Sequence, residues 1–82
     1  MICRYEFTLR ATCPVDGTLD VYDVAVESPD AVHVEHILAS AAALVAKPVL
    51  QEDLTAALAR TLGCRVVTSG HHSGVKTTVG CP

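Results

Sequence analysis

The chain has 82 residues, of which half are hydrophobic and only 18% are charged, and its net charge is −3. Six Lys and Arg residues do not supply the basic surface that sequence-independent nucleic-acid binding requires. The length predicts a single domain over residues 1–82, with a core too small to bury so much apolar surface. We therefore expect the chain to bury the surplus against copies of itself.

Arg4 and Glu6 place charges within the first six residues, and no apolar run approaches the length of a membrane span. We therefore predict no secretory signal and expect a cytoplasmic protein. In that compartment the four cysteines are expected to be thiols or ligands and not disulfides.

Strict alternation of apolar and polar residues predicts a first strand over residues 3–13. The segment Pro14–Gly17 has turn chemistry, since proline presets φ and glycine tolerates a positive φ. The β-branched content of residues 19–27 predicts that the chain returns as a second strand.

Apolar residues at helical spacing predict a helix over residues 34–46, which Pro48 prevents from continuing. A second helix is predicted from leucines at positions 50, 54, 58 and 62, with Gly63 suited to its C-terminal cap.

Two further strands are predicted over residues 64–69 and 75–79, around a Gly70–Gly74 turn. His71 and His72 lie in that turn, where a solvated hairpin tip is the usual interpretation. The order ββααββ predicts an α+β fold, with an antiparallel sheet and both helices on one face. Such a sheet has open edges, which assembly into an oligomeric barrel would pair.

Cys13 ends the first strand on its apolar face, and Asp20 begins the returning strand, so the turn brings thiol and carboxylate together. A thiolate is a nucleophile, and a nearby acid can protonate a nitrogen on the group that is attacked. On spacing alone, a structural cysteine beside a Pro-Gly turn is the favoured interpretation.

The segment Cys13–Asp20 resembles the Cys-Pro-Val-x-Gly-x-x-Asp motif of QueF, the nitrile reductase that acts on 7-cyano-7-deazaguanine in queuosine biosynthesis. Val34-Glu35 matches the Val-Glu of the family's next block, and Gln51-Glu52 stands where the reductases have His-Glu and GTP cyclohydrolases have Gln-Glu. The resemblance spans roughly residues 7 to 80. It implies the tunnelling fold (T-fold) and a homo-oligomer of pentamers or stacked pentamers, with sites between subunits.

The resemblance also implies roles for individual residues. Cys13 would attack the nitrile carbon to form a covalent thioimide, and Asp20 would give a proton to the nitrile nitrogen. Glu52 would anchor the guanine-like edge of the base, with Glu35 and Gln51 assisting, since a carboxylate accepts two parallel N–H bonds. Without the resemblance, Glu35 and Glu52 are ordinary acids in the first turn of a helix.

The cofactor that the resemblance implies is NADPH, but its binding motif is largely absent. The reductases hold its phosphates with a Ser-Lys-Ser-Leu-Lys run, where this chain has His36–Ser40, and with an Arg-Gly-Gly, where it has Ser73–Val75. An archaeal relative that adds ammonia to the same nitrile, making the amidine of archaeosine tRNA, also lacks the lysine run. Reduction and amidine formation are therefore both retained as hypotheses. The substrate is either a free 7-deazaguanine base or one within RNA or DNA.

Two other hypotheses are kept. Zinc in a GTP-cyclohydrolase-like pterin enzyme would use ligands such as Cys13, His71, His72 and Cys81. The Cys-x-x-His and His-x-Cys patterns of that family are not met, so we expect no metal. The other is a non-catalytic subunit that keeps only a purine-binding pocket.

Overall fold

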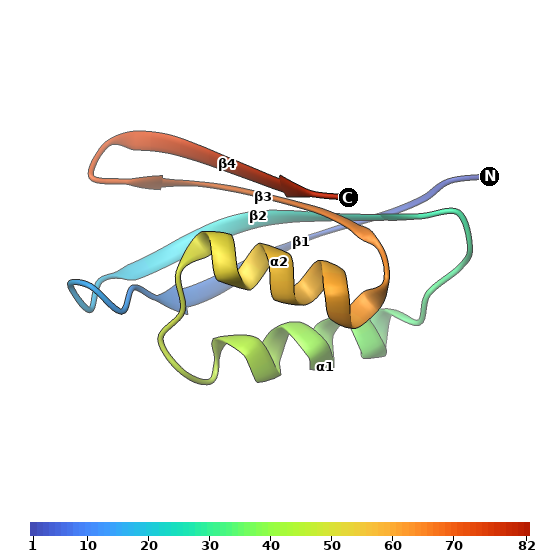
Figure 1. Cartoon of the computed structure of the whole chain (residues 1–82), viewed down its shortest axis with the longest axis horizontal. Coiled ribbons are helices and arrows are strands. Elements are labelled where there is room, and N and C mark those ends of the chain that lie inside the picture. Colours follow the sequence, from blue (N-terminus) through green and yellow to red (C-terminus); the bar gives the residue numbers. More distant parts are fainter.

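Four antiparallel strands in the order β1-β2-β3-β4 form one sheet, and two helices cover one of its faces (Figure 1). The computed structural model describes all 82 residues. The elements are β1 (Cys3–Thr12), β2 (Leu19–Ser28), α1 (Val34–Val45), α2 (Gln51–Leu62), β3 (Arg65–His72) and β4 (Val75–Cys81). The predicted ββααββ order and α+β class are confirmed, and neither 12-residue helix is long and apolar enough to cross a membrane.

The alternating pattern of β1 places its odd-numbered residues under the helices, in register with even-numbered residues of β2, as in Tyr5 opposite Val26. The opposite face of the sheet is polar on β1. There Glu27 accepts hydrogen bonds from Arg4 Nη1 and Arg65 Nη1, both at 2.9 Å, which links three neighbouring strands. These exposed pairs contribute little to stability individually.

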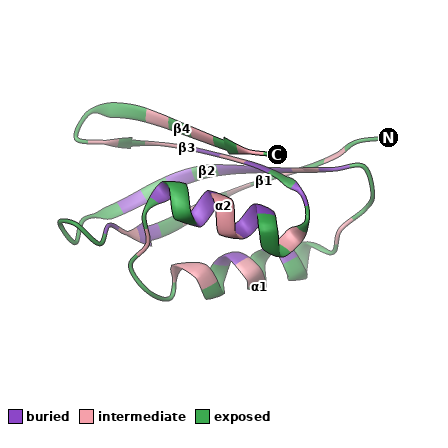
Figure 2. Cartoon of the chain, in the orientation of Figure 1, coloured by how far each residue is buried: buried purple, intermediate pink, exposed green.

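The hydrophobic core lies between the helices and the inner face of the sheet (Figure 2). Its buried members are Ala11, Tyr22, Val24, Val26, Ile37, Ala41, Leu54, Leu58, Ala59, Cys64 and Val66. Only 18 of the 82 residues are buried, and apolar side chains such as Leu19, Val21 and Leu38 remain substantially exposed. The thin core therefore matches the expectation for so short a chain.

Both helices end within one residue of the predicted positions. α1 stops at Val45, just before Pro48 makes a helical backbone impossible. α2 ends at Gly63, whose φ of 64° is left-handed and whose N–H donates to the carbonyl of Ala59.

The last hairpin differs from its prediction. β3 continues to His72, and only Ser73 and Gly74 form the turn, with φ of 51° and 80°. Two successive positive φ values are typical of a type I′ turn, whose twist matches that of the flanking strands. His71 and His72 are therefore strand residues, and the predicted five-residue turn with a solvated histidine tip is wrong.

A buried polar network fixes the first turn of α2 to β3 and β4. The Gln51 Nε2 amide donates to Thr68 Oγ1 at 3.1 Å and to the Thr77 carbonyl at 3.1 Å, while Gln51 Oε1 accepts from Thr77 Oγ1 at 2.6 Å. Thr55 Oγ1 donates its single proton to the Gln51 carbonyl, so the 2.7 Å contact between Thr55 and Thr68 has Thr68 as donor. No buried side-chain polar atom lacks a partner, so the network is complete.

Replacing Thr68 by valine keeps the shape but removes one donor and one acceptor from this network. We expect the free energy of unfolding to fall by about 1–3 kcal/mol, because Thr55 and Gln51 each lose a buried partner. Urea unfolding at fixed protein concentration measures the change. Thr78→Val, on an exposed position of β4, is the matched control. Equal midpoints for the two variants would contradict the network's role.

Candidate active site

The candidate site lies where β2 and β3 separate. The last β2–β3 pair is Asp23 with Ser69, whereas β3 stays paired with β4 as far as His72. Beyond the last pair, the Tyr22 ring packs so closely on Gly70 that a Cβ there would be 2.8 Å from Tyr22 Cδ1. The ring therefore occupies the place where a β3 side chain would otherwise lie, and the strands end on opposite sides of a pocket.

Cys13 is held rigidly at the start of the β1–β2 turn. Its N–H donates to the Thr18 carbonyl at 2.8 Å, and its carbonyl accepts from the N–H of Gly17 at 2.9 Å. The Thr12 carbonyl accepts from the N–H of Val49, at 3.0 Å, which ties the α1–α2 linker to the end of β1. Cys13 itself is 7% exposed. The predicted turn thus serves to fix the position of the thiol.

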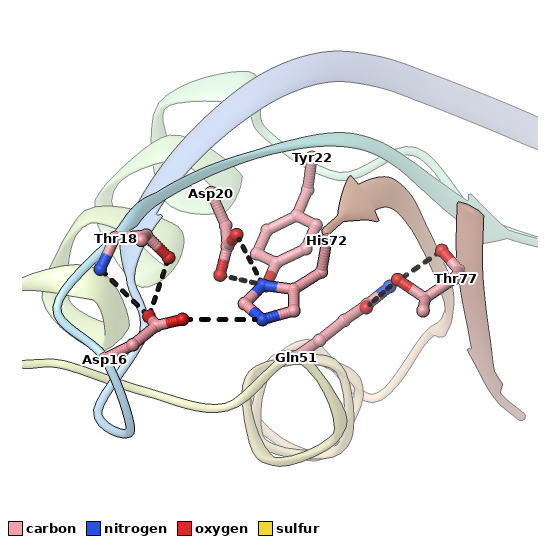
Figure 3. A network of polar contacts seen from close by, with 7 residues as sticks. All are labelled: Asp16, Thr18, Asp20, Tyr22, Gln51, His72 and Thr77. Carbon is pink, nitrogen blue, oxygen red and sulfur yellow. Dashed lines mark hydrogen bonds and ion pairs between the residues drawn. The ribbon is translucent and has the colours of Figure 1, made fainter. Parts of the chain in front are cut away.

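Asp20 and His72 meet across the gap between β2 and β3 (Figure 3). His72 Nδ1 lies 3.3 Å from Asp20 Oδ1, and the Tyr22 hydroxyl donates to Asp20 Oδ2 at 3.3 Å. Burial, followed by the neighbouring Asp20 charge, raises the pKa of Tyr22 to about 12. The phenol therefore stays protonated and acts only as a donor to Asp20 below that pH.

Asp16 holds the opposite edge of the His72 ring, with Oδ2 3.6 Å from Nε2. Asp16 Oδ1 accepts from both the hydroxyl of Thr18, at 2.7 Å, and its N–H, at 3.0 Å. These two hydrogen bonds, supplemented by the Cys13 thiol and by His72, lower the pKa of the Asp16 carboxyl. Asp16 is therefore a carboxylate over the physiological range, and the imidazole lies between two acids.

These groups line a pocket of about 250 Å³. Its walls are Cys13, Val15, Asp20, Tyr22, Val49, Leu50, Gln51, Glu52, His72 and Thr77. Among the residues predicted from sequence, Cys13, Asp20, Gln51 and Glu52 are thus brought together. Gln51 is 6% exposed and its amide is bound by the strands, so its contribution here is to anchor the turn that carries the exposed Glu52.

Glu35 does not reach this pocket. It lies in the first turn of α1, at the end of the helix layer beside the chain termini, whereas the two strand turns and the start of α2 lie at the other end (Figure 1). A 12-residue helix is about 18 Å long, so Glu35 and Cys13 of one chain cannot contact the same small base.

The pocket does not fit the phosphates of NADPH. No Lys or Arg lines it, while Asp20 and Glu52 do, and the first turn of α1 presents Glu35. Phosphate recognition needs positive side chains or free helix N-terminal amides, and carboxylates repel it. This pocket therefore presents no Lys or Arg side chain to the phosphates of that cofactor.

The pocket offers ligand types that zinc accepts. One atom each from Cys13, Asp20 and His72 lies within 4.8 Å of the others. In the structure, however, Asp20 already accepts from Tyr22 and contacts His72.

The sequence analysis did not predict that His72 lines the pocket with Cys13 and Asp20, because it placed His72 in a turn. The alternation along β3 could have identified His72, because it is an even-numbered residue like the buried Val66 and Thr68 and so lies on the same face of the strand.

Comparison with solved structures finds the archaeosine synthase QueF-Like in its apo form, with a TM-score of 0.82 and 19% sequence identity. The match covers 98% of this chain and 90% of that chain. No protein-family model matches the sequence, and no curated protein does. The likeness confirms the predicted tunnelling fold, although a shared fold does not by itself fix the chemistry.

Gly70→Ala tests the close packing that shapes the site. A Cβ at Gly70 would lie 2.8 Å from both Tyr22 Cδ1 and the Val21 carbonyl, so ring and strand must shift. We expect the free energy of unfolding to fall by about 1–3 kcal/mol, as for overpacking. Gly80→Ala is the matched control, because its nearest contact is an ordinary 3.7 Å to Val67 Cγ2. Urea titration should separate the two, and equal losses would refute the packing argument.

Proposed function

We propose that this chain is a QueF-like enzyme that binds the nitrile of a 7-cyano-7-deazaguanine covalently through Cys13 and converts it to an amidine with ammonia. The observation that carries the proposal is the convergence of Cys13, Asp20 and Glu52 on one small pocket. A nucleophile, an acid and a carboxylate anchor are the three groups that nitrile capture on a guanine-like base requires.

The size of the pocket suits one bicyclic base. Ligand pockets are typically about 300–1,000 Å³ for drug-sized molecules, and this pocket, at about 250 Å³, lies just below that range. The exposed Glu52 carboxylate would accept the ring N–H and the exocyclic amine of the guanine-like edge in parallel. The apolar walls at Val15, Val49 and Leu50 suit the faces of the heterocycle.

The bonds and protons that change during nitrile capture can all be supplied by groups in the pocket. The Cys13 sulfur bonds to the nitrile carbon while one carbon–nitrogen π bond breaks. The thiol loses its proton, and the nitrile nitrogen gains one through Asp20. The product is a neutral thioimide, and no reductant is consumed.

Amidine formation is favoured over reduction because the pocket carries carboxyl groups and no Lys or Arg side chain. An anionic pocket attracts ammonium and repels the phosphates of NADPH. The predicted homo-oligomer would supply Glu35 from a second copy, and the unpaired outer edges of β1 and β4 are where barrel assembly would join chains.

Intact-protein mass spectrometry after mixing with 7-cyano-7-deazaguanine tests the proposal. We expect a stoichiometric adduct of the mass of the base, absent from Cys13→Ala and retained in Cys64→Ala. Cys64 is the matched control because it is 8% exposed and Cys13 is 7% exposed. Ammonium should then discharge the adduct and release the base with the mass of ammonia added, whereas NADPH should leave it in place.

Each other outcome has a distinct meaning. Discharge by NADPH would overturn the amidine part and favour the reductase. No adduct with the wild-type chain would overturn covalent capture altogether. In that case bound zinc, found by metal analysis, would favour the zinc-dependent hypothesis, and tight binding of the base without zinc would favour a non-catalytic subunit.

A further inference from the structure

His72 is placed at the pocket by two separate features of the fold. It is the last residue of β3, and it lies on the same face as the buried Val66 and Thr68, so its ring points under the helices. The short Ser73-Gly74 turn keeps the hairpin paired up to this residue. The side chain is 42% exposed, so it reaches both solvent and the pocket.

The surroundings of His72 are acidic on every side. Asp16, of the β1–β2 turn, lies 3.6 Å from Nε2, and Asp20, of β2, lies 3.3 Å from Nδ1. Across the pocket, α2 contributes Glu52 and β2 contributes the Tyr22 phenol, which stays neutral. With the Cys13 thiol these are the titratable groups facing the ring, and none is a base. Each ring nitrogen thus faces a carboxyl group, and the two acids hold the ring in one orientation.

Discharge of a thioimide by ammonia needs a group that takes a proton. The attacking nitrogen becomes positively charged as its bond to carbon forms, and the sulfur leaves as a thiolate. The Tyr22 phenol is a donor in this pH range, and Asp20 has its own role at the nitrile nitrogen during capture. An imidazole that lines the pocket and reaches solvent is the group suited to receive that proton.

We propose that His72, held between Asp16 and Asp20, is the general base for the addition of ammonia to the Cys13 thioimide. This inference rests on the proposed function. In the step, the bond from the thioimide carbon to the attacking nitrogen forms as the C=N π bond opens, and a proton passes from that nitrogen to His72. The π bond then re-forms as the carbon–sulfur bond breaks, and the proton returns to the Cys13 sulfur. Thioimide and ammonia thus give amidine and free thiol without electron transfer.

A structural role would predict a different pattern of loss. If His72 only links the two acids, its removal should loosen the turn and slow every step alike. If it is the base, its removal should spare nitrile capture and should slow discharge most for the amine whose attacking nitrogen holds its proton most tightly. Hydroxylamine makes the distinction, because its nitrogen becomes more acidic than that of ammonia after attack and can lose its proton to water, and because it is the stronger nucleophile.

The experiment uses chelator-treated full-length protein, so that a bound metal is not what is measured. The adduct is formed first with 7-cyano-7-deazaguanine, and its decay is then followed by mass spectrometry after addition of ammonium or hydroxylamine. For His72→Gln we expect adduct formation within a few-fold of wild type. Ammonium discharge should fall by about 10²–10⁴-fold, the usual range for loss of a general base. Hydroxylamine discharge should fall by less than about tenfold.

His71→Gln is the matched control, since His71 is the adjacent strand residue on the opposite face, and it should behave as wild type. The pH profile adds a second readout. Wild-type discharge by ammonium should decline as pH falls and the imidazole becomes protonated, and His72→Gln should lose that His72-dependent limb. Asp16→Asn should slow ammonium discharge less than His72→Gln does, since it alters only how the ring is held.

Equal slowing with both amines, or no slowing with either, would overturn the role of His72 while leaving covalent capture intact. Failure of the wild-type chain to form any adduct would instead overturn the proposed function, and this inference with it. The two failures are distinguished because adduct formation is measured before the amine is added.

Discussion

The side-chain amide of Gln51 is the interaction on which the rest of the site depends. It bridges the first turn of α2 to Thr68 on β3 and Thr77 on β4, and it does so from a buried position. A buried amide without partners would cost a few kcal/mol, so the helix cannot slide along the sheet without breaking several bonds at once. The neighbouring Glu52 is thereby held over the pocket, and the β3–β4 hairpin is held at a fixed distance from it.

The contacts of Gln51 also explain why the β3–β4 hairpin remains paired beyond the point where β2 and β3 separate. Past the last pair of β2 and β3, the hairpin is supported by its own turn and by α2, and Tyr22 packs on Gly70 in the space that opens. Cys13 and Asp20 then lie on one side of the opening, and His72 on the other. Residues more than fifty positions apart in the sequence therefore share one pocket, in which acidic groups set the local field.

Much of the fold follows from local patterns that the sequence displays openly. Strict alternation over β1 and the Pro-Gly turn after it predict a hairpin. A hairpin places Cys13 beside Asp20 independently of the tertiary contacts of the rest of the chain. Leucine spacing and Gly63 give α2 its face and its end. These inferences need only neighbours along the chain, which is why they agree with the structure.

The remaining features depend on tertiary contacts that no local pattern encodes. The sequence of residues 70–74 is compatible with a loose turn as well as with three more strand pairs, and Tyr22 packed over Gly70 accompanies the paired form. Gln51 was likewise predicted to assist Glu52 in binding the base, and its role in joining α2 to the strands was not predicted, because its partners lie 17 and 26 positions away. Glu35 lies at the far end of α1, so only a second copy could bring it to the pocket.

Selective alkylation of Cys13 tests the central claim, that this pocket activates and presents a nucleophile. Cys64 is an internal reference, because it is equally buried but donates to the Leu62 carbonyl in the core. The folded protein is treated with iodoacetamide near neutral pH, and each cysteine-containing peptide is quantified over time. We expect Cys13 to react at least about tenfold faster than Cys64, because Cys13 lines the pocket that a small reagent can enter, whereas the Cys64 thiol donates to the Leu62 carbonyl. Equal and slow labelling of both would mean that Cys13 is a structural thiol, and would contradict the account.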